Sequence, residues 1–119
     1  MDIAKIFEDN GLYVGRMVGG SKTGYCKMYP KNKVIFNANV ITTSGKVWYG
    51  DLDLTVSEEV LKKISAEIGE PLYVLYEMDA RFGTEERDIA NLIKDAMFVV
   101  DKDGLKFGQK GEQFKKYYK

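Results

Sequence analysis

Two pairs of acidic residues have the spacing that metal or acid–base chemistry requires. Asp51 and Asp53 alternate in an extended run, so both carboxylates should lie on one face of a strand, close enough to hold a hard cation such as Mg²⁺. Glu77 and Asp79 alternate in the same way at the end of a later strand, where they could act as a general acid and a general base. Solvated or turn-bonded carboxylates are the commoner outcome at strand ends, so the sequence favours a structural role for both pairs.

The segment Arg81-Phe82-Gly83, directly before an expected helix, is a stronger candidate for ligand chemistry. Free N–H groups at a helix N-terminus attract phosphate, and an arginine can hold phosphate through two parallel hydrogen bonds. Phe82 can stack on a nucleobase, and Asn91, two turns into the helix, can hydrogen-bond a base edge. The alternative, to which the sequence gives equal weight, puts Phe82 in the core and pairs Arg81 with Glu85.

Charge is unevenly distributed along a chain whose net charge is zero. Residues 11–50 contain six basic residues and no acid, residues 57–100 contain five basic and ten acidic residues, and residues 101–119 contain six basic and three acidic residues. This asymmetry predicts an electropositive surface for an anionic partner, or else lysines that protect strand edges and keep them soluble.

Several kinds of chemistry are excluded by residues that the sequence lacks. There is no histidine and only one cysteine, Cys26, which rules out Ser–His, Cys–His and His-metal sites within the chain. We therefore expect no catalytic residues, no metal and no cofactor. The single cysteine, the lack of a signal pattern at the N-terminus and the lack of an apolar run near ~20 residues predict a cytoplasmic protein that does not enter a membrane.

The elements that must position these residues follow from hydrophobic periodicity and turn residues. Residues 2–10 have a capping aspartate, apolar side chains on one face and a glycine directly after them, which is typical of a short helix. Runs rich in Val, Ile, Tyr, Thr and Phe predict four strands, and the short turns between them require antiparallel pairing. These strands cover residues 12–18, 24–29, 34–42 and 46–55.

The second half of the sequence alternates helices with strands. Ser57 is typical of an N-cap, and Gly69 closes the helix that Ser57 begins. A strand follows at residues 72–78, and a second principal helix opens at Thr84. The apolar stripe of that helix consists of Ile89, Leu92, Ile93 and Ala96. A final hairpin has strands at residues 97–100 and 105–107.

This order of elements predicts an α+β fold in one domain. We expect a mainly antiparallel sheet, made of a four-strand meander and the later strands, with two principal helices packed on one face. The length of 119 residues fits a single domain over residues 1–119. Residues 108–119 are polar and basic, and we expect this tail to be ordered by a partner subunit if it is ordered at all.

The strand meander contains the run VWYGDLDLT at residues 47–55 and is followed by a helix. The loop Ala80-Arg81-Phe82-Gly83 then leads to a helix containing Asn91. Together these features resemble the phage Thoeris anti-defence proteins, in particular the first family so named. The resemblance covers nearly the whole chain.

The resemblance implies a binding protein and not an enzyme. Proteins of this family sequester cyclic ADP-ribose isomers made by bacterial TIR-domain immune proteins, so the NADase effector never receives its signal. The ligand stays intact in recessed pockets where two subunits meet, which implies a homodimer or a higher homo-oligomer. Some members form hexamers and also hold cyclic trinucleotides at a separate site. Neither a membrane nor DNA is an expected partner.

The resemblance also implies roles for particular residues. Phe82 matches the adenine-stacking aromatic residue, and Asn91 matches the helix asparagine that lines the pocket. By charge alone, the candidates for basic pocket residues are Arg81, Arg16, Lys106 and Lys110. The residues themselves leave two alternatives open: a metal-dependent nucleotide phosphodiesterase that uses Asp51, Asp53, Glu77 or Asp79, and a single-stranded nucleic-acid-binding module that uses the basic strands and the tail.

Overall fold

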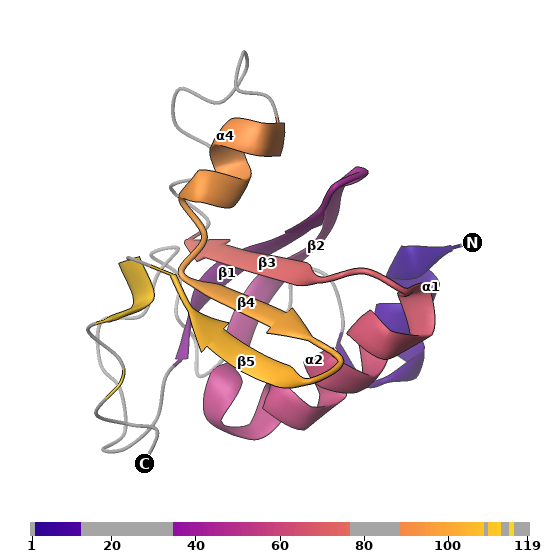
Figure 1. Ribbon diagram of the computed structural model, residues 1–119. Coiled ribbons are helices and arrows are strands. Elements are labelled where there is room, and N and C mark those ends of the chain that lie inside the picture. The colour runs from indigo at the N-terminus through magenta and orange to yellow at the C-terminus, as the bar shows by residue number, and fades with distance from the viewer. Residues whose placement is uncertain (1, 13–34, 77–88, 109, 113–114, 116–119) are drawn as a thin grey trace.

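A computed structural model describes residues 2–12, 35–76, 89–108, 110–112 and 115 (Figure 1). Within these residues the fold is α+β, as the sequence predicts, with a five-strand antiparallel sheet and helices packed on it. The helices are α1 (Ile3–Asp9), α2 (Leu54–Ile68) and α4 (Ile89–Lys94). The strands are β1 (Ile35–Thr42), β2 (Gly45–Asp53), β3 (Leu72–Tyr76), β4 (Phe98–Asp101) and β5 (Gly104–Phe107). In this part of the chain no helix is both long enough and apolar enough to cross a bilayer.

The strands lie in the order β2-β1-β3-β4-β5, and each neighbouring pair is antiparallel. Both β1–β2 and β4–β5 are hairpins of consecutive strands, and β3 lies between them. The last two strands of the expected meander correspond to β1 and β2. Its first two strands, at residues 12–18 and 24–29, lie outside the described residues except for Leu12, which packs against the core.

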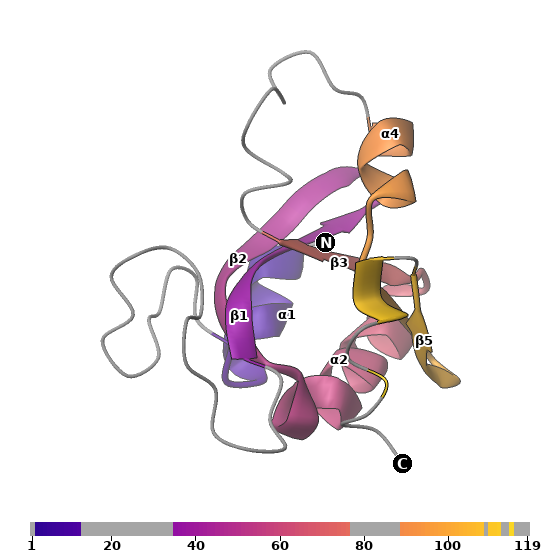
Figure 2. The same ribbon diagram turned by 90° about the vertical axis from the view of Figure 1, so that its left-hand side faces the viewer.

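The larger core lies between the sheet and the helices α1 and α2, which Figure 2 shows inside the curve of the sheet. Alternating strand residues point to this side, including Val40, Val74 and Phe98. From α2, Leu61 and Ile64 are fully buried against them. A register shift between Val40 and Ile41 lets the consecutive residues Val47 and Trp48 of β2 both pack into the same core.

Helix α1 closes one end of this core. The Asp2 side chain accepts a hydrogen bond from the backbone N–H of Lys5, so Asp2 is the N-cap that the sequence predicts. The Phe7 ring is fully buried and stacks on Trp48, with 6.1 Å between ring centroids and 14° between ring planes. The aromatic pair fixes α1 against β2.

The expected start of α2 at Ser57 is wrong. The helix begins at Leu54, immediately after β2 ends at Asp53, and the Ser57 residue is buried inside it. The strand also ends earlier than the expected residue 55. Capping preference is worth about 1 kcal/mol, which is less than the burial of a helix face can contribute, so the tertiary fold decides where the helix starts.

The expectation that the principal helices share one face is also wrong. Helix α4 packs on the opposite face of the sheet, where Leu92 and Ala96 are buried against Ile41 and Leu75. Ile41 and Leu75 differ by an odd number of positions from the inward-facing Val40 and Val74, so they point to the other side. The apolar stripe of α4 is the one that the sequence predicts. The face of the sheet against which the stripe packs differs from the predicted face.

Candidate functional site

Three of the six predicted site residues can be located in the structure. Asn91, Lys106 and Lys110 are described, whereas Arg16, Arg81 and Phe82 lie outside the described residues. The acidic pair Glu77 and Asp79 lies outside them as well. The geometry of the site is therefore built from α4, the C-terminal hairpin and the residues that follow that hairpin.

Asn91 lies on the exposed side of α4. The helix buries Leu92 against the sheet, and Ile89 and Ile93 pack against the same cluster. A residue at position 91 is therefore turned away from the sheet. An asparagine amide has both donors and an acceptor, so a side chain in this place can hydrogen-bond the edge of a nucleobase.

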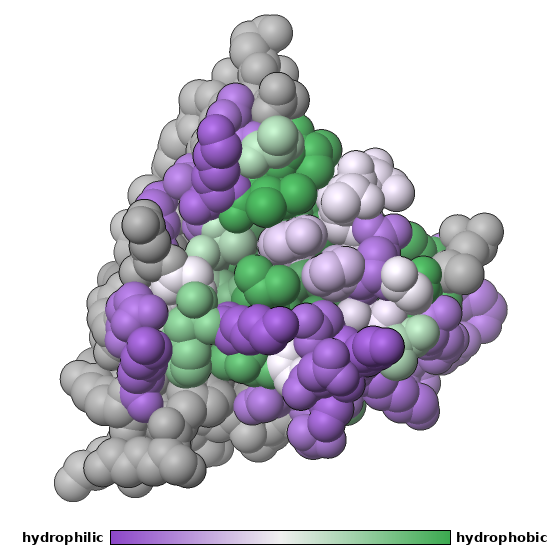
Figure 3. All heavy atoms as spheres, in the orientation of Figure 1, coloured by the Kyte–Doolittle hydropathy of each residue, from purple (hydrophilic) through white to green (hydrophobic). Residues whose placement is uncertain are grey.

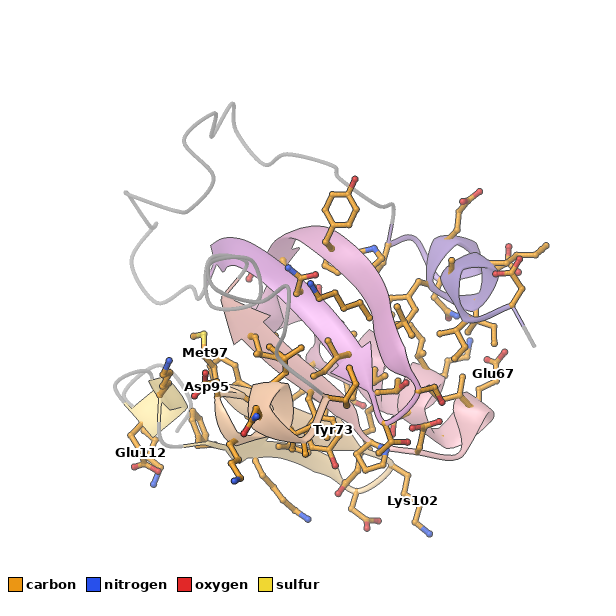
Figure 4. The ribbon with its side chains drawn as sticks, turned by 90° about the horizontal axis from the view of Figure 1, so that it is seen from above. Glu67, Tyr73, Asp95, Met97, Lys102 and Glu112 are labelled. Carbon is orange, nitrogen blue, oxygen red and sulfur yellow. The ribbon has the colours of Figure 1, made fainter. Side chains whose placement is uncertain are left out.

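Lys110 lies near the C-terminal end of α4. Its ammonium nitrogen is 3.8 Å from a carboxylate oxygen of Asp95, the residue that follows the helix. Asp95 stands four positions after Asn91, so these two residues lie about one helical turn apart. Figure 4 shows Asp95 and Met97 beside the short helical turn that carries Glu112. The structure thus places Lys110 against Asp95, the residue that follows the helix containing Asn91.

Backbone contacts hold Lys110 in that region. The N–H of Gly108 donates to the carbonyl oxygen of Met97 at 2.8 Å, and the N–H of Gly111 donates to the carbonyl oxygen of Gly108 at 3.0 Å. A β-carbon at Gly108 would overlap the carbonyl oxygen of Ala96, and one at Gly111 would overlap that of Met97. Only glycine allows the two backbones to approach this closely.

Lys106 is directed elsewhere. It stands opposite Val99 in the β4–β5 pair, and its ammonium contacts the Asp101 carboxylate at 3.1 Å. Asp95 precedes β4 and Asp101 is the last residue of that strand, so the two lysines that these carboxylates hold lie towards opposite ends of β4. The backbone N–H of Asp103 at 2.8 Å, together with the Lys106 ammonium, lowers the pKa of the Asp101 carboxyl.

A groove that the sequence does not reveal lies at the end of α2. It has a volume of about 450 Å³ and is formed by the exit of α2 and the β4–β5 turn. Its ionisable side chains are Glu70, Asp101, Asp103 and Lys102. Three carboxylates against one ammonium make the groove unsuited to a phosphate ligand, and none of the three described site residues, Asn91, Lys106 and Lys110, lines it.

Asp51 and Asp53 are both residues of β2. These residues stand opposite Asn37 and Ile35 in the β1–β2 pair, two positions apart on one strand. Within the described ranges, no three acidic or cysteine side chains come together in a way that could hold a metal ion.

Apolar surface remains partly exposed beside α4. Tyr73, Ile89 and Ile93 are only partly buried where they pack against the smaller core. Figure 3 shows this apolar area (green) running from α4 onto the sheet, with hydrophilic side chains (purple) along its border. These side chains therefore leave apolar atoms at the surface beside α4.

No family model matches this chain, and neither a curated protein nor a solved structure matches it.

Proposed function

We propose that this protein binds and sequesters a cyclic ADP-ribose isomer without cleaving it, and so blocks immune signalling by TIR-domain proteins. The proposal starts from the resemblance to the first family of phage Thoeris anti-defence proteins. The structural observation that carries it is the place of Asn91 on the exposed side of α4.

The Asn91 side chain suits the chemistry of the ligand. A cyclic ADP-ribose isomer has an adenine, whose edge an amide can hydrogen-bond, and a pyrophosphate, which basic side chains can hold. Phe82, which precedes α4 in the sequence, supplies the stacking surface in this proposal, and Arg81 and Arg16 supply further positive charge. Lys106 is the weakest member of the set, because its ammonium is held by Asp101.

Sequestration demands tight binding. A nanomolar dissociation constant corresponds to about −12 kcal/mol, which a partly exposed site on one small domain rarely supplies. The partly exposed apolar surface around Tyr73 and Ile93 favours association of two copies, and a pocket closed by a second subunit would be drier. We therefore propose a homodimer or a higher homo-oligomer that acts in the cytoplasm of the host bacterium.

A release assay tests the proposal. The protein is mixed with a cyclic ADP-ribose isomer, separated from free ligand by gel filtration and heated, and the released nucleotide is identified by mass spectrometry. Recovery of the intact isomer supports sequestration. Recovery of a hydrolysed product, formed by a reaction that EDTA suppresses, points to a phosphodiesterase instead. If no nucleotide is recovered at all, the proposal is overturned.

Two variants test the site. Phe82→Ala and Asn91→Ala should each abolish capture, because each removes a proposed ligand contact. Asn91→Ala should leave the melting temperature unchanged, since Asn91 is exposed on α4. Glu67→Ala is the matched control, since Glu67 is an exposed residue of α2 on another part of the surface (Figure 4). Full capture by both site variants would show that the ligand binds elsewhere.

A further inference from the structure

We infer that Gly108, Lys110 and Gly111 form a clasp that positions α4, and with it Asn91, and that Lys110 acts on ligand binding through Asp95. The part that concerns binding rests on the proposed function. The part that concerns the position of α4 does not, because it follows from contacts within the chain. In this arrangement Lys110 is a positioning residue. Its charge alone had suggested that it contacts phosphate directly.

Helix α4 depends on contacts with other parts of the chain for its stability and direction. It has six residues, and a helix that short is not stable on its own in water. Its buried contacts with the sheet come from few side chains, chiefly Leu92 and, just after the helix, Ala96. Figure 1 shows α4 at one edge of the fold, rising from the sheet instead of lying along it. The direction of the helix therefore depends on how its ends are held.

The exit of α4 is held from two sides. The N–H of Met97 donates to the carbonyl oxygen of Val74 in β3 at 2.8 Å, and the carbonyl oxygen of Met97 accepts from the N–H of Gly108 at 2.8 Å. Met97 is itself fully buried. The two glycines of the clasp then pack backbone against backbone on residues 96 and 97. This arrangement joins the helix exit to β3 on one side and to the clasp on the other.

The ion pair between Lys110 and Asp95 also holds the last turn of the helix in place. Asp95 directly follows α4, where the helix carbonyl groups repel a carboxylate. The Lys110 ammonium at 3.8 Å offsets that repulsion, and the two side chains are 29% and 44% exposed for Asp95 and Lys110 respectively. Because Asp95 lies about one turn from Asn91, a change in the pair should alter the orientation of the surface that presents the Asn91 amide.

A double-mutant cycle separates positioning from direct contact. The variants are Lys110→Met, Asp95→Asn, their combination, and the charge swap that joins Asp95→Lys to Lys110→Asp. If Lys110 acts through Asp95, each single variant should weaken capture of cyclic ADP-ribose by a similar factor, on the order of three- to tenfold. The combination should be no weaker than the poorer single variant, and the swap should recover most of the loss.

Hydrogen exchange provides a readout that needs no ligand. Amide exchange at residues 89–97 should become faster in Lys110→Met and in Asp95→Asn, and should return towards the wild-type rate in the charge swap. Glu112→Gln is the matched control, because it removes one carboxylate from the neighbouring Glu112–Lys115 pair (2.8 Å) and leaves Asp95 untouched. It should change neither capture nor exchange by more than about twofold.

Two results would overturn the inference, and both differ from failure of the proposed function. Weaker capture by Lys110→Met together with unchanged or tighter capture by Asp95→Asn would mean that Lys110 contacts the ligand directly. Unchanged exchange of α4 in both single variants would mean that there is no clasp. Absence of capture by the wild-type protein would overturn the proposed function alone, since the exchange rates still decide whether the clasp positions α4.

Discussion

The backbone of Gly111 lies against the carbonyl group of Met97 so closely that a β-carbon at position 111 would overlap the Met97 oxygen. The contact joins the segment after β5 to the segment between α4 and β4. It explains why residues 108 and 110–112, which belong to a polar and basic stretch of sequence, pack on the fold. The packing is between backbone atoms, which hydrophobic periodicity does not report.

The first prediction concerns this contact. Gly111→Ala should lower the free energy of unfolding by about 1–3 kcal/mol, because the added methyl group meets backbone that cannot rotate away. Urea unfolding followed by circular dichroism measures the change. Glu112→Gln, at the exposed neighbouring position, should stay within about 0.5 kcal/mol of wild type. Equal stability of Gly111→Ala and Glu112→Gln would contradict the close approach.

The second prediction concerns the aromatic pair that holds α1. Phe7→Ala should destabilise the protein by about 3–5 kcal/mol, because a fully buried ring is replaced by a cavity next to Trp48. Trp48 is the only tryptophan, so its emission should shift to longer wavelength if α1 detaches. Phe7→Leu keeps most of the apolar volume and should cost less than about 1.5 kcal/mol. An unshifted emission spectrum and a loss below about 1 kcal/mol in Phe7→Ala would refute this role of Phe7.

The third prediction concerns the turn between β1 and β2. One carboxylate oxygen of Glu70 accepts hydrogen bonds from the backbone N–H of Thr43 at 3.1 Å and from its hydroxyl at 2.8 Å. Glu70→Ala should therefore lower stability by about 1 kcal/mol, a modest loss because the pair is exposed. Glu67→Ala, on the exposed surface of α2, should change stability by less than about 0.5 kcal/mol in the same thermal unfolding assay. Similar values for the two variants would mean that the link to Thr43 contributes nothing.

The fourth prediction concerns pH. The Asp103 backbone N–H and the Lys106 ammonium lower the pKa of Asp101 in the folded state, so the folded protein binds this proton less readily than the unfolded chain. The resulting stabilisation is present above the unfolded pKa, near pH 4, and is lost as the pH falls through the folded pKa. Wild type should therefore exceed Asp101→Asn in unfolding midpoint above about pH 5, and the difference should shrink on acidification.

The same titration provides its own control. Lys106→Met removes the second cause of the pKa shift and leaves the first, the Asp103 N–H, in place. Its pH-dependent loss should therefore be smaller than that of Asp101→Asn. A difference between wild type and Asp101→Asn that stays constant from about pH 6 to pH 2 would show that the Asp101 carboxyl does not contribute in this way.

Hydrophobic periodicity predicted those parts of the fold that depend on one buried face. The cap at Asp2, the burial of Leu61 and Ile64 in α2, and the stripe containing Leu92 and Ala96 all agree with the structure. Each of these features is decided within a few neighbouring residues, where the helical repeat of 3.6 residues reports burial directly. The α+β class follows from the same local signals.

The predictions that were wrong concern features that are determined by contacts between distant parts of the chain. Ser57 has the side chain of an N-cap but lies within α2, because β2 runs into the helix without a loop. Strand β1 buries Val40 towards α2 and Ile41 towards α4, so its apolar residues alone do not show which helix covers which face. A periodic pattern shows that a side chain is buried but does not identify its partner.

The candidate site, like the fold, could be predicted from the sequence only in part. The exposed position of Asn91 follows from the stripe of its own helix. The pairing of Lys110 with Asp95 does not follow from charge, since many acids were equally available to this lysine. It depends on the approach of Gly108 and Gly111 to residues 96 and 97, and in a sequence these glycines look the same as glycines in ordinary turns.

Strand β3 lies between two hairpins, and this order has a consequence for how the chain reaches its native state. Hairpins β1–β2 and β4–β5 each join consecutive strands through short turns, so each can close at a small cost in chain entropy. Strand β3 must meet β1 across the whole of α2, and β4 across α4 and the residues before it. Pairings over such distances form slowly, so the central strand of the finished sheet should be the last to acquire both of its neighbours during folding.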